Sequence, residues 1–145
     1  MRSGFDKQLT ELNREMISMG SLCENAIAMS AKALLDGDAA LAKKVSELSA
    51  QIERKERDIE SMCLKLLLQQ QPVAKDLRVI SSALKMVTDM ERIGDHAADI
   101  SELTVAMAGT PYKLRGDNIK RMAAETIVML VDAVDSYVTK DMAKA

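Results

Sequence analysis

The sequence predicts an all-α protein, in which three long helices form an up-down-up bundle and a fourth helix follows. Three observations lead to this fold class. Hydrophobic residues make up 48% of the 145 positions but aromatic residues only 2%, so the apolar mass is aliphatic and methionine-rich, which suits helices better than strands. The 6 glycines and 2 prolines gather at a few breaks. Between these breaks, apolar residues recur at alternating steps of three and four, the spacing of a helix seam.

The first predicted helix covers about residues 5–35. Its seam consists of apolar or small residues at steps of four and three: Phe5, Leu9, Leu12, Met16, Met19, Cys23, Ala26 and Ser30. Gly37 suits the left-handed position that follows a helix C-terminus. Asp38 suits the N-cap of the next helix.

The second predicted helix covers about residues 39–70, and the third about residues 72–107. The seam of the second runs through Leu41, Val45, Leu48, Ile52, Ile59, Met62 and Leu66, and Lys55 interrupts it. Pro72 is expected in the first turn of the third helix, where its missing N–H costs nothing. Helices of about 30 residues are about 45 Å long, and tight connections require consecutive helices to run in opposite directions.

A fourth helix is predicted from residue 118 to the C-terminus, with Asp117 as its N-cap. It matches the first helix weakly at a shift of 103 positions, which places Tyr137 on Leu34. An internal repeat explains this match, and so does the period that all amphipathic helices share. The predicted organisation is a three-helix bundle over 1–108, a linker over 109–117 and the fourth helix over 118–145.

Charge and cysteine content exclude several classes of function. The 20 basic and 22 acidic residues leave a net charge of −2, which argues against a nucleic-acid-binding protein and against attraction to an anionic membrane. No apolar run approaches the roughly 18–20 residues of a membrane span, and no secretory signal is visible. Cys23 and Cys63 are isolated thiols, typical of reduced cytosolic proteins. We therefore expect a cytoplasmic protein without direct membrane insertion.

The most informative feature is an acidic run on the third predicted helix. Glu91, Asp95 and Asp99 are spaced by four residues, on or beside the seam that begins with Val73 and Leu77. Like charges at this spacing repel, and their burial costs free energy. A basic side chain such as Lys55 could compensate, as could a raised pKa of one acid or a multivalent cation. Pattern alone favours solvated or paired acids over a bound metal.

Two neighbours of the acidic run bear on this choice. Gly94 in mid-helix costs about 1 kcal/mol relative to alanine, and it predicts close approach of another backbone or a bound ion. His96 is the only histidine and is interpreted as a surface residue. The Glu-x-x-His pairs of di-iron bundles are missing from the sequence, as is a Ser/His/Asp set.

Two runs in the third predicted helix and the connection before it resemble the PhoU family: QQPVAKDLR over 70–78 and ERIGDHA over 91–97. The resemblance extends over about residues 5–105. It implies the first of two tandem three-helix bundles, followed by the first helix of a second one. In this family the last helix of each bundle carries an E(D)xxxD motif that binds metal ions, with multinuclear iron among them. The resemblance thus implies metal binding by Glu91 and Asp95, with Asp99 one turn further.

The resemblance also implies a function. PhoU proteins are adaptors, not enzymes, that repress the phosphate-starvation response of bacteria by linking a phosphate ABC transporter to a sensor histidine kinase. The alternatives are a metal-dependent enzyme, such as a hydrolase or oxidase, and a passive helical scaffold. The fourth helix has an apolar face with no second bundle to bury it, so we expect it to pack on its own bundle or on a second copy, as a homodimer.

Overall fold

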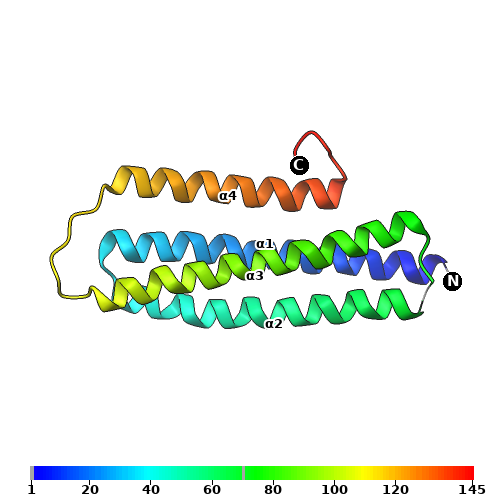
Figure 1. The fold of residues 1–145 in the computed structure, drawn as a ribbon, viewed down its shortest axis with the longest axis horizontal. Helices are drawn as coiled ribbons and strands as arrows, with labels where there is room; N and C mark the ends of the chain where they lie inside the picture. Colours follow the sequence, from blue (N-terminus) through cyan, green and yellow to red (C-terminus); the bar gives the residue numbers. More distant parts are fainter. Residues whose placement is uncertain (1, 70) are drawn as a thin grey trace.

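The computed structural model describes residues 2–69 and 71–145 and shows an all-α protein, as predicted. Its helices are α1 (Arg2–Asp36), α2 (Ala39–Gln69), α3 (Ala74–Ala106) and α4 (Gly116–Thr139). Successive helices run in opposite directions, and α4 lies along α1 on the side away from α2 (Figure 1). The up-down-up bundle with an added fourth helix is therefore confirmed. Residue 70, the predicted end of the second helix, lies outside the described residues.

The turn between α1 and α2 has the predicted chemistry. Gly37 has a φ of +64°, a conformation that costs a glycine little. The Asp38 carboxylate accepts a hydrogen bond of 3.0 Å from the Leu41 N–H, which caps α2. This short connection forces α1 and α2 into an antiparallel pair.

The predicted starts of the other two helices need correction. Val73 is the N-cap of α3, with φ −73° and ψ 166°, so Pro72 precedes the helix instead of lying in its first turn. The N-cap of α4 is Arg115, without a side-chain capping bond. Asp117 therefore lies inside the first turn of α4, where its charge still complements the helix dipole.

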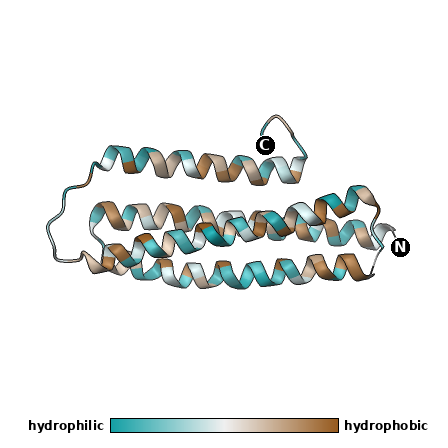
Figure 2. Ribbon diagram, viewed as in Figure 1, coloured by the Kyte–Doolittle hydropathy of each residue, from teal (hydrophilic) through white to brown (hydrophobic). Residues whose placement is uncertain are grey.

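Hydrophobic and hydrophilic residues alternate along all four helices (Figure 2). The predicted seam of α1 is buried throughout, apart from the half-buried Leu9. The seam of α3, in contrast, is shifted by one position along half of its length. Its buried residues are Asp76, Ile80, Ala83, Val87, Met90, Gly94, Ala97, Ser101 and Thr104. Small residues in this register let α3 approach its neighbours closely, so Val73 and Leu77 remain exposed at 59% and 44%.

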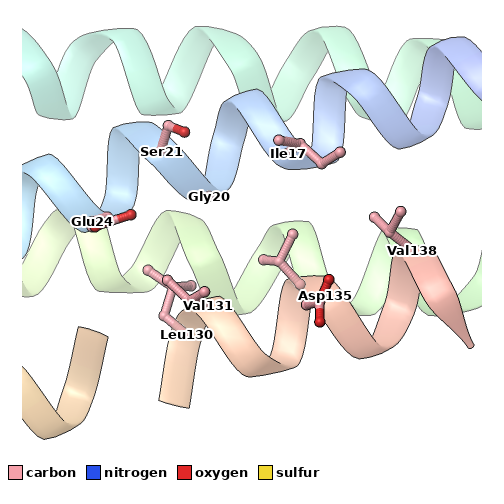
Figure 3. Close-up of a pocket in the computed structure, with 9 residues that line it drawn as sticks. Ile17, Gly20, Ser21, Glu24, Leu130, Val131, Asp135 and Val138 are labelled. Carbon is pink, nitrogen blue, oxygen red and sulfur yellow. The ribbon is translucent and has the colours of Figure 1, made fainter. Parts of the chain in front are cut away.

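α4 packs on its own bundle, one of the two predicted outcomes. A Cβ built on Gly20 of α1 would lie only 3.2 Å from the Cγ2 atom of Val134, so the glycine makes room for α4. Gly20 and Ile17 face Leu130 and Val131 across this contact (Figure 3). Of α4, only Leu130 and Val134 are buried. The helix therefore rests on the bundle along a narrow strip.

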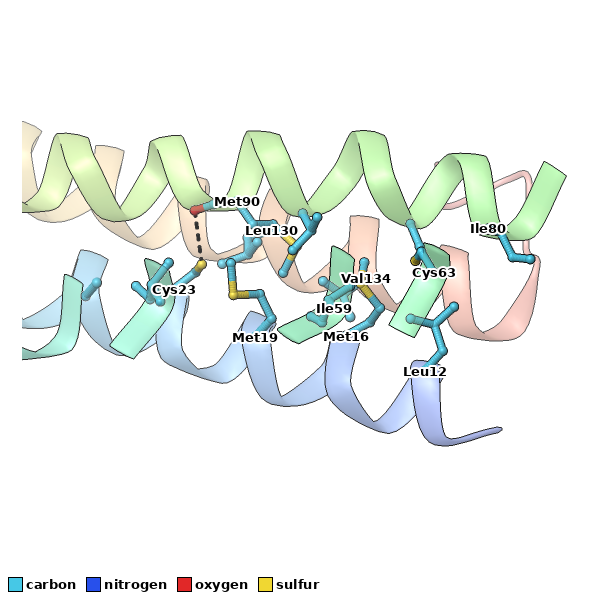
Figure 4. Close-up of a cluster of buried hydrophobic side chains, with 14 of the residues drawn as sticks. Leu12, Met16, Met19, Cys23, Ile59, Cys63, Ile80, Met90, Leu130 and Val134 are labelled. Carbon is cyan, nitrogen blue, oxygen red and sulfur yellow. Dashed lines mark hydrogen bonds between the residues drawn. The ribbon is translucent and has the colours of Figure 1, made fainter. Parts of the chain in front are cut away.

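The core is a cluster of side chains from all four helices, aliphatic or sulfur-containing apart from Phe5 (Figure 4). The Cys23 thiol donates a hydrogen bond of 3.3 Å to the backbone carbonyl of Met90, which joins α1 to α3. Both cysteines are buried and free. Burial raises the pKa of Cys23 to about 12 and that of Cys63 to about 11, so these thiols are packing residues rather than nucleophiles.

Within the described residues, none of the helices combines the length and the apolar character that crossing a membrane requires.

Candidate functional site

The acidic run of α3 lies on the flank of the bundle, beside its buried seam. Glu91 is half-buried, and Asp95 and Asp99 are exposed. The register of α3 explains this position, because Met90 and Gly94 occupy the seam on either side. The acids thus keep part of their hydration, which lowers the cost of holding like charges together.

A second group of acids, on α2, faces this run. Burial raises the pKa of Glu56 to about 7, and the negative charges of Glu91, Glu60 and Asp95 add to the shift. These electrostatic effects show that the carboxylates of the two helices lie near one another. We call Glu53, Glu56, Glu60, Glu91 and Asp95 the acidic patch. Asp99 is not among the acids that act on Glu56 or Glu91.

The sequence-based prediction missed the α2 half of the patch, although a signal was present. Steps of three and four from Ile52 reach positions 55 and 56 before Ile59. Lys55 interrupts the predicted seam, and Glu56 follows it directly. Lys55 and Glu56 form a polar pair in the middle of an otherwise apolar seam. At this point α2 directs charged side chains toward the neighbouring helices.

Glu91 responds to the patch in the same direction as Glu56. Its pKa is raised by burial, then by a hydrogen bond with Asp95, which requires a proton on one of the two carboxyls. The charges of Asp95 and Glu53 contribute further. Glu91 and Glu56 thus both hold protons more tightly than an isolated glutamate does.

Basic side chains do little to neutralise the patch. Lys55 pairs with Glu15 of α1 at 2.7 Å, so the prediction that it could compensate the α3 acids is wrong. Arg57 pairs with Glu53 at 3.0 Å. Over residues 2–69 and 71–145, Glu56, Glu60, Glu91 and Asp95 form no ion pair. Of the three predicted compensators, the raised pKa is the one that the structure supports.

The donor chemistry of the patch suits a hard cation, because carboxylate oxygens are the ligands that such ions prefer. Among the described residues, however, no three acidic, histidine or cysteine side chains converge on a point that could hold a metal ion. The carboxylates would have to rotate toward one another to share one. Metal binding by Glu91, Asp95 and Asp99 therefore stays a prediction.

Gly94 has a different role from the one predicted. A Cβ at this position would lie 3.1 Å from both the Cδ1 and the Cγ2 atoms of Ile52. The close neighbour is thus a side chain of α2, and neither a backbone nor an ion is needed to explain the glycine. Gly94 lets Ile52 fill the seam between α2 and α3, directly beside the acidic patch.

His96 lies away from the acidic patch, on the side of α3 that faces α4. It is exposed, as predicted. Together with Ile100 and Met122 it lines an apolar groove of about 370 Å³ between α1, α3 and α4. A second groove of about 290 Å³ continues between α3 and α4 and is lined by Met86, Met90 and Met129, among others.

An acidic patch and apolar grooves on a helical bundle are features of a binding protein. The comparisons with known proteins identify the family of this binding protein. The PhoU domain family matches residues 16–104. The chain belongs to the PhoU family. This membership confirms the predicted family.

Several individual proteins are similar over nearly the whole chain. A homologue of the phosphate-specific transport system accessory protein PhoU from Synechocystis is 36% identical over 129 residues, 89% of this chain and 58% of the relative. A homologue from Pseudomonas aeruginosa is 32% identical over 138 residues, 94% of this chain and 57% of the relative. The chain thus spans little more than half the length of these relatives.

Solved structures share the fold. The crystal structure of PhoU from Pseudomonas aeruginosa superimposes with a TM-score of 0.90 at 30% identity, over 97% of this chain and 68% of that one. The structure of the phosphate transport system regulatory protein PhoU from Streptococcus pneumoniae gives 0.87 at 25% identity. The position of α4 on α1 is included in this agreement, because nearly all of the chain is covered.

Proposed function

We propose that this protein is a cytoplasmic adaptor of phosphate homeostasis. In this role it represses the phosphate-starvation response by linking a phosphate ABC transporter to a sensor histidine kinase. One observation carries the proposal: four helices superimpose on a PhoU protein with a TM-score of 0.90, at 30% identity. The relatives are accessory proteins of phosphate-specific transport, which supports a phosphate transporter as a partner.

We further propose that the acidic patch binds a divalent or trivalent metal ion such as iron. Glu91 and Asp95 would supply ligands from α3, with Asp99 one turn away. Glu56 and Glu60 face them from α2. The unpaired negative charge and the raised pKa of Glu56 support this, because a cation would relieve the same repulsion that a proton relieves. The side chains would release protons as the ion binds.

Phosphate regulation is tested in a bacterium that lacks the gene for its own repressor of the phosphate-starvation response. Expression of the 145-residue chain should restore low activity of a phosphate-starvation reporter in phosphate-rich medium. Copurification with the transporter and the kinase should show both partners. If the reporter stays derepressed and neither partner copurifies, the chain is a passive scaffold in this pathway.

Metal binding is tested separately, by elemental analysis and thermal melting after incubation with ferrous, ferric or manganese ions. The Glu91→Ala/Asp95→Ala variant should lose the bound metal and the metal-induced rise in melting temperature. A matched control is Glu47→Ala/Glu102→Ala, which removes one exposed acid from α2 and one from α3 outside the patch. Equal metal content in all three proteins would show that the patch is not the site.

A further inference from the structure

Apolar side chains are exposed at the end of the bundle where α2 connects to α3. Leu64 and Leu68 of α2 are exposed at 54% and 83%. Val73 and Leu77, at the start of α3, are exposed at 59% and 44%. We call these four residues the apolar end. Single exposed apolar residues are common on protein surfaces, but a group of them at one place is a feature of binding surfaces.

The register of α2 and α3 brings the residues of the apolar end together. Ile52 fills the space where a Cβ on Gly94 would lie, so these two positions are opposite each other. Leu68 lies 16 residues after Ile52, and Leu77 lies 17 residues before Gly94. The two helices are antiparallel (Figure 1) and rise equally per residue. Leu68 and Leu77 therefore lie at the same level of the bundle, about 24 Å from the Ile52 contact.

The apolar end lies on the same flank of the bundle as the acidic patch. On α2, Glu60, Leu64 and Leu68 follow one another at steps of four, so each is about 40° around the helix from the one before. On α3, Leu77 and Glu91 are 14 residues apart and project within about 40° of each other. This flank therefore carries acidic residues along its middle and apolar residues at its end.

The charge of the flank limits what can bind to it. In the part of the chain that the structure describes, Glu56, Glu60, Glu91 and Asp95 form no ion pair, so their negative charge is open to an incoming cation. A nucleic acid or an anionic membrane would be repelled, because both carry negative charge. A metal ion would neutralise the middle of the flank and leave the apolar end uncovered. A polypeptide with basic and apolar side chains covers both parts.

From this arrangement we infer that the flank of α2 and α3 is the docking surface for a basic amphipathic helix of a partner protein. Lysine or arginine side chains of that helix lie over Glu60 and Asp95, and its apolar side chains lie over Leu68 and Leu77. Such helices bind through anchors at steps of three, four and seven, and opposite charges fix their direction. The inference goes beyond the proposed function, because it requires neither phosphate regulation nor a bound metal.

The probe is a fluorescein-labelled peptide of about 18 residues, which is long enough as a helix to cover the flank. One face of its helix carries lysines in the first half and leucines in the second. Fluorescence anisotropy with the 145-residue chain and a chelator should give a Kd on the order of 10 μM. Added salt should weaken binding, because exposed charges are screened. A second peptide with glutamates in place of the lysines should not bind.

Two variants each remove one half of the surface. Glu56→Gln/Glu60→Gln removes two negative charges at nearly constant volume, and Leu68→Ser/Leu77→Ser removes two exposed apolar side chains. Each should raise the Kd about fivefold or more, and the first should also reduce the salt dependence. Circular dichroism should show unchanged helix content, because all four side chains are at least partly in solvent.

Matched controls change the same kinds of residue elsewhere on the molecule. Glu47→Gln/Glu102→Gln removes two exposed acids outside the patch. Val128→Ser/Met129→Ser removes two exposed apolar side chains from α4. Both controls should bind the lysine peptide with a Kd within about twofold of the wild-type value.

Several outcomes would overturn the inference. These are no binding of the lysine peptide, equal binding of the glutamate peptide, or an unchanged Kd in either variant of the flank. Cosedimentation with phosphatidylglycerol vesicles that Leu68→Ser/Leu77→Ser abolishes would assign the surface to a membrane instead. A self-association in sedimentation equilibrium that the same variant abolishes would assign it to a second copy of the chain.

Discussion

The bundle of α1–α3 and the added helix α4 differ in how many neighbours their apolar side chains have. In the bundle, Leu12, Met16 and Ile80 are completely buried. On α4, the most buried residues are Leu130 and Val134, at 6% and 8%, and Met129 remains 71% exposed. Yet α4 is at least as apolar as the other helices. The difference shows that a hydrophobic helix is held by the faces around it and not by its own composition.

The strongest way to break the bundle is to remove a side chain from its centre. Leu12→Ala should lower the free energy of unfolding by about 3 kcal/mol, because it removes buried methyl groups and leaves a cavity. Urea denaturation followed by circular dichroism measures this loss. Leu68→Ala, at a position 83% exposed on α2, should change the stability little. A similar loss in both variants would mean that the core lies elsewhere.

Gly20→Leu should separate the two regions. The new side chain would collide with Val134, whose Cγ2 lies 3.2 Å from the Cβ position. The attachment of α4 should weaken by about 2 kcal/mol. The bundle itself should not lose stability, because leucine is a better helix former than glycine. Hydrogen exchange read by mass spectrometry should show faster exchange confined to α4. Gly4→Leu is the control, since its Cβ would meet nothing within 4 Å.

Within the bundle, Glu56 lowers the stability of the folded state at neutral pH. Burial raises its pKa to about 7 in the folded protein, above the ordinary value of 4.5, so the folded state binds more protons between these values. Stability contributed by this proton is present at acidic pH and is lost as the pH rises toward 7 and above. Glu56→Gln should therefore stabilise the protein at pH 7.5 by about 1 kcal/mol, a value discounted for the half-exposed side chain.

Thermal melting between pH 5 and 8, with a chelator present, measures the effect of Glu56→Gln. The advantage of the variant should shrink toward pH 5. Glu125→Gln, on the exposed surface of α4, should follow the wild type across the range. An advantage of Glu56→Gln that does not vary with pH would contradict the raised pKa.

The smallest effect is expected where the linker meets α1. The Tyr112 hydroxyl donates a hydrogen bond of 2.9 Å to the Leu34 carbonyl, in the last turn of α1. Tyr112→Phe should cost about 0.5–1 kcal/mol and should loosen the start of α4 more than its end. Hydrogen exchange of peptides from the two halves of α4 distinguishes this from a uniform change, which would contradict a local role of the linker.

The sequence predicted the fold well because the signals were local. The seam of α1, Gly37 and Asp38 depend on neighbours in the chain and were predicted correctly. The seam of α3 was predicted one position away from the buried one over half of its length. The predicted seam and the buried seam of α3 share Ile80, Val87 and Gly94. Only the packing of α3 against two other helices decides which of the two is buried. The same packing decides that Glu91 lies on the flank.

Only the α3 half of the acidic patch could be predicted from the sequence. The α3 acids stand out through their spacing, whereas the α2 acids matter only because the bundle brings Glu56 opposite Glu91. The partner of Lys55 could not be inferred for the same reason, since Glu15 is 40 positions away along the chain. Long-range pairs of this kind depend on helix register, which a single amphipathic pattern does not specify.

The contact between Gly20 and Val134 also bears on the order in which the chain folds during synthesis. α1, α2 and α3 are neighbours in sequence and meet through short turns, so they can assemble as soon as they leave the ribosome. α4 emerges after these three helices, and it packs on α1, the earliest of the four. Until then the strip around Ile17 and Gly20 stays uncovered. A nascent chain that stops between α3 and α4 would therefore expose this strip to chaperones. The strip is covered, and can no longer bind them, once Val134 packs on it.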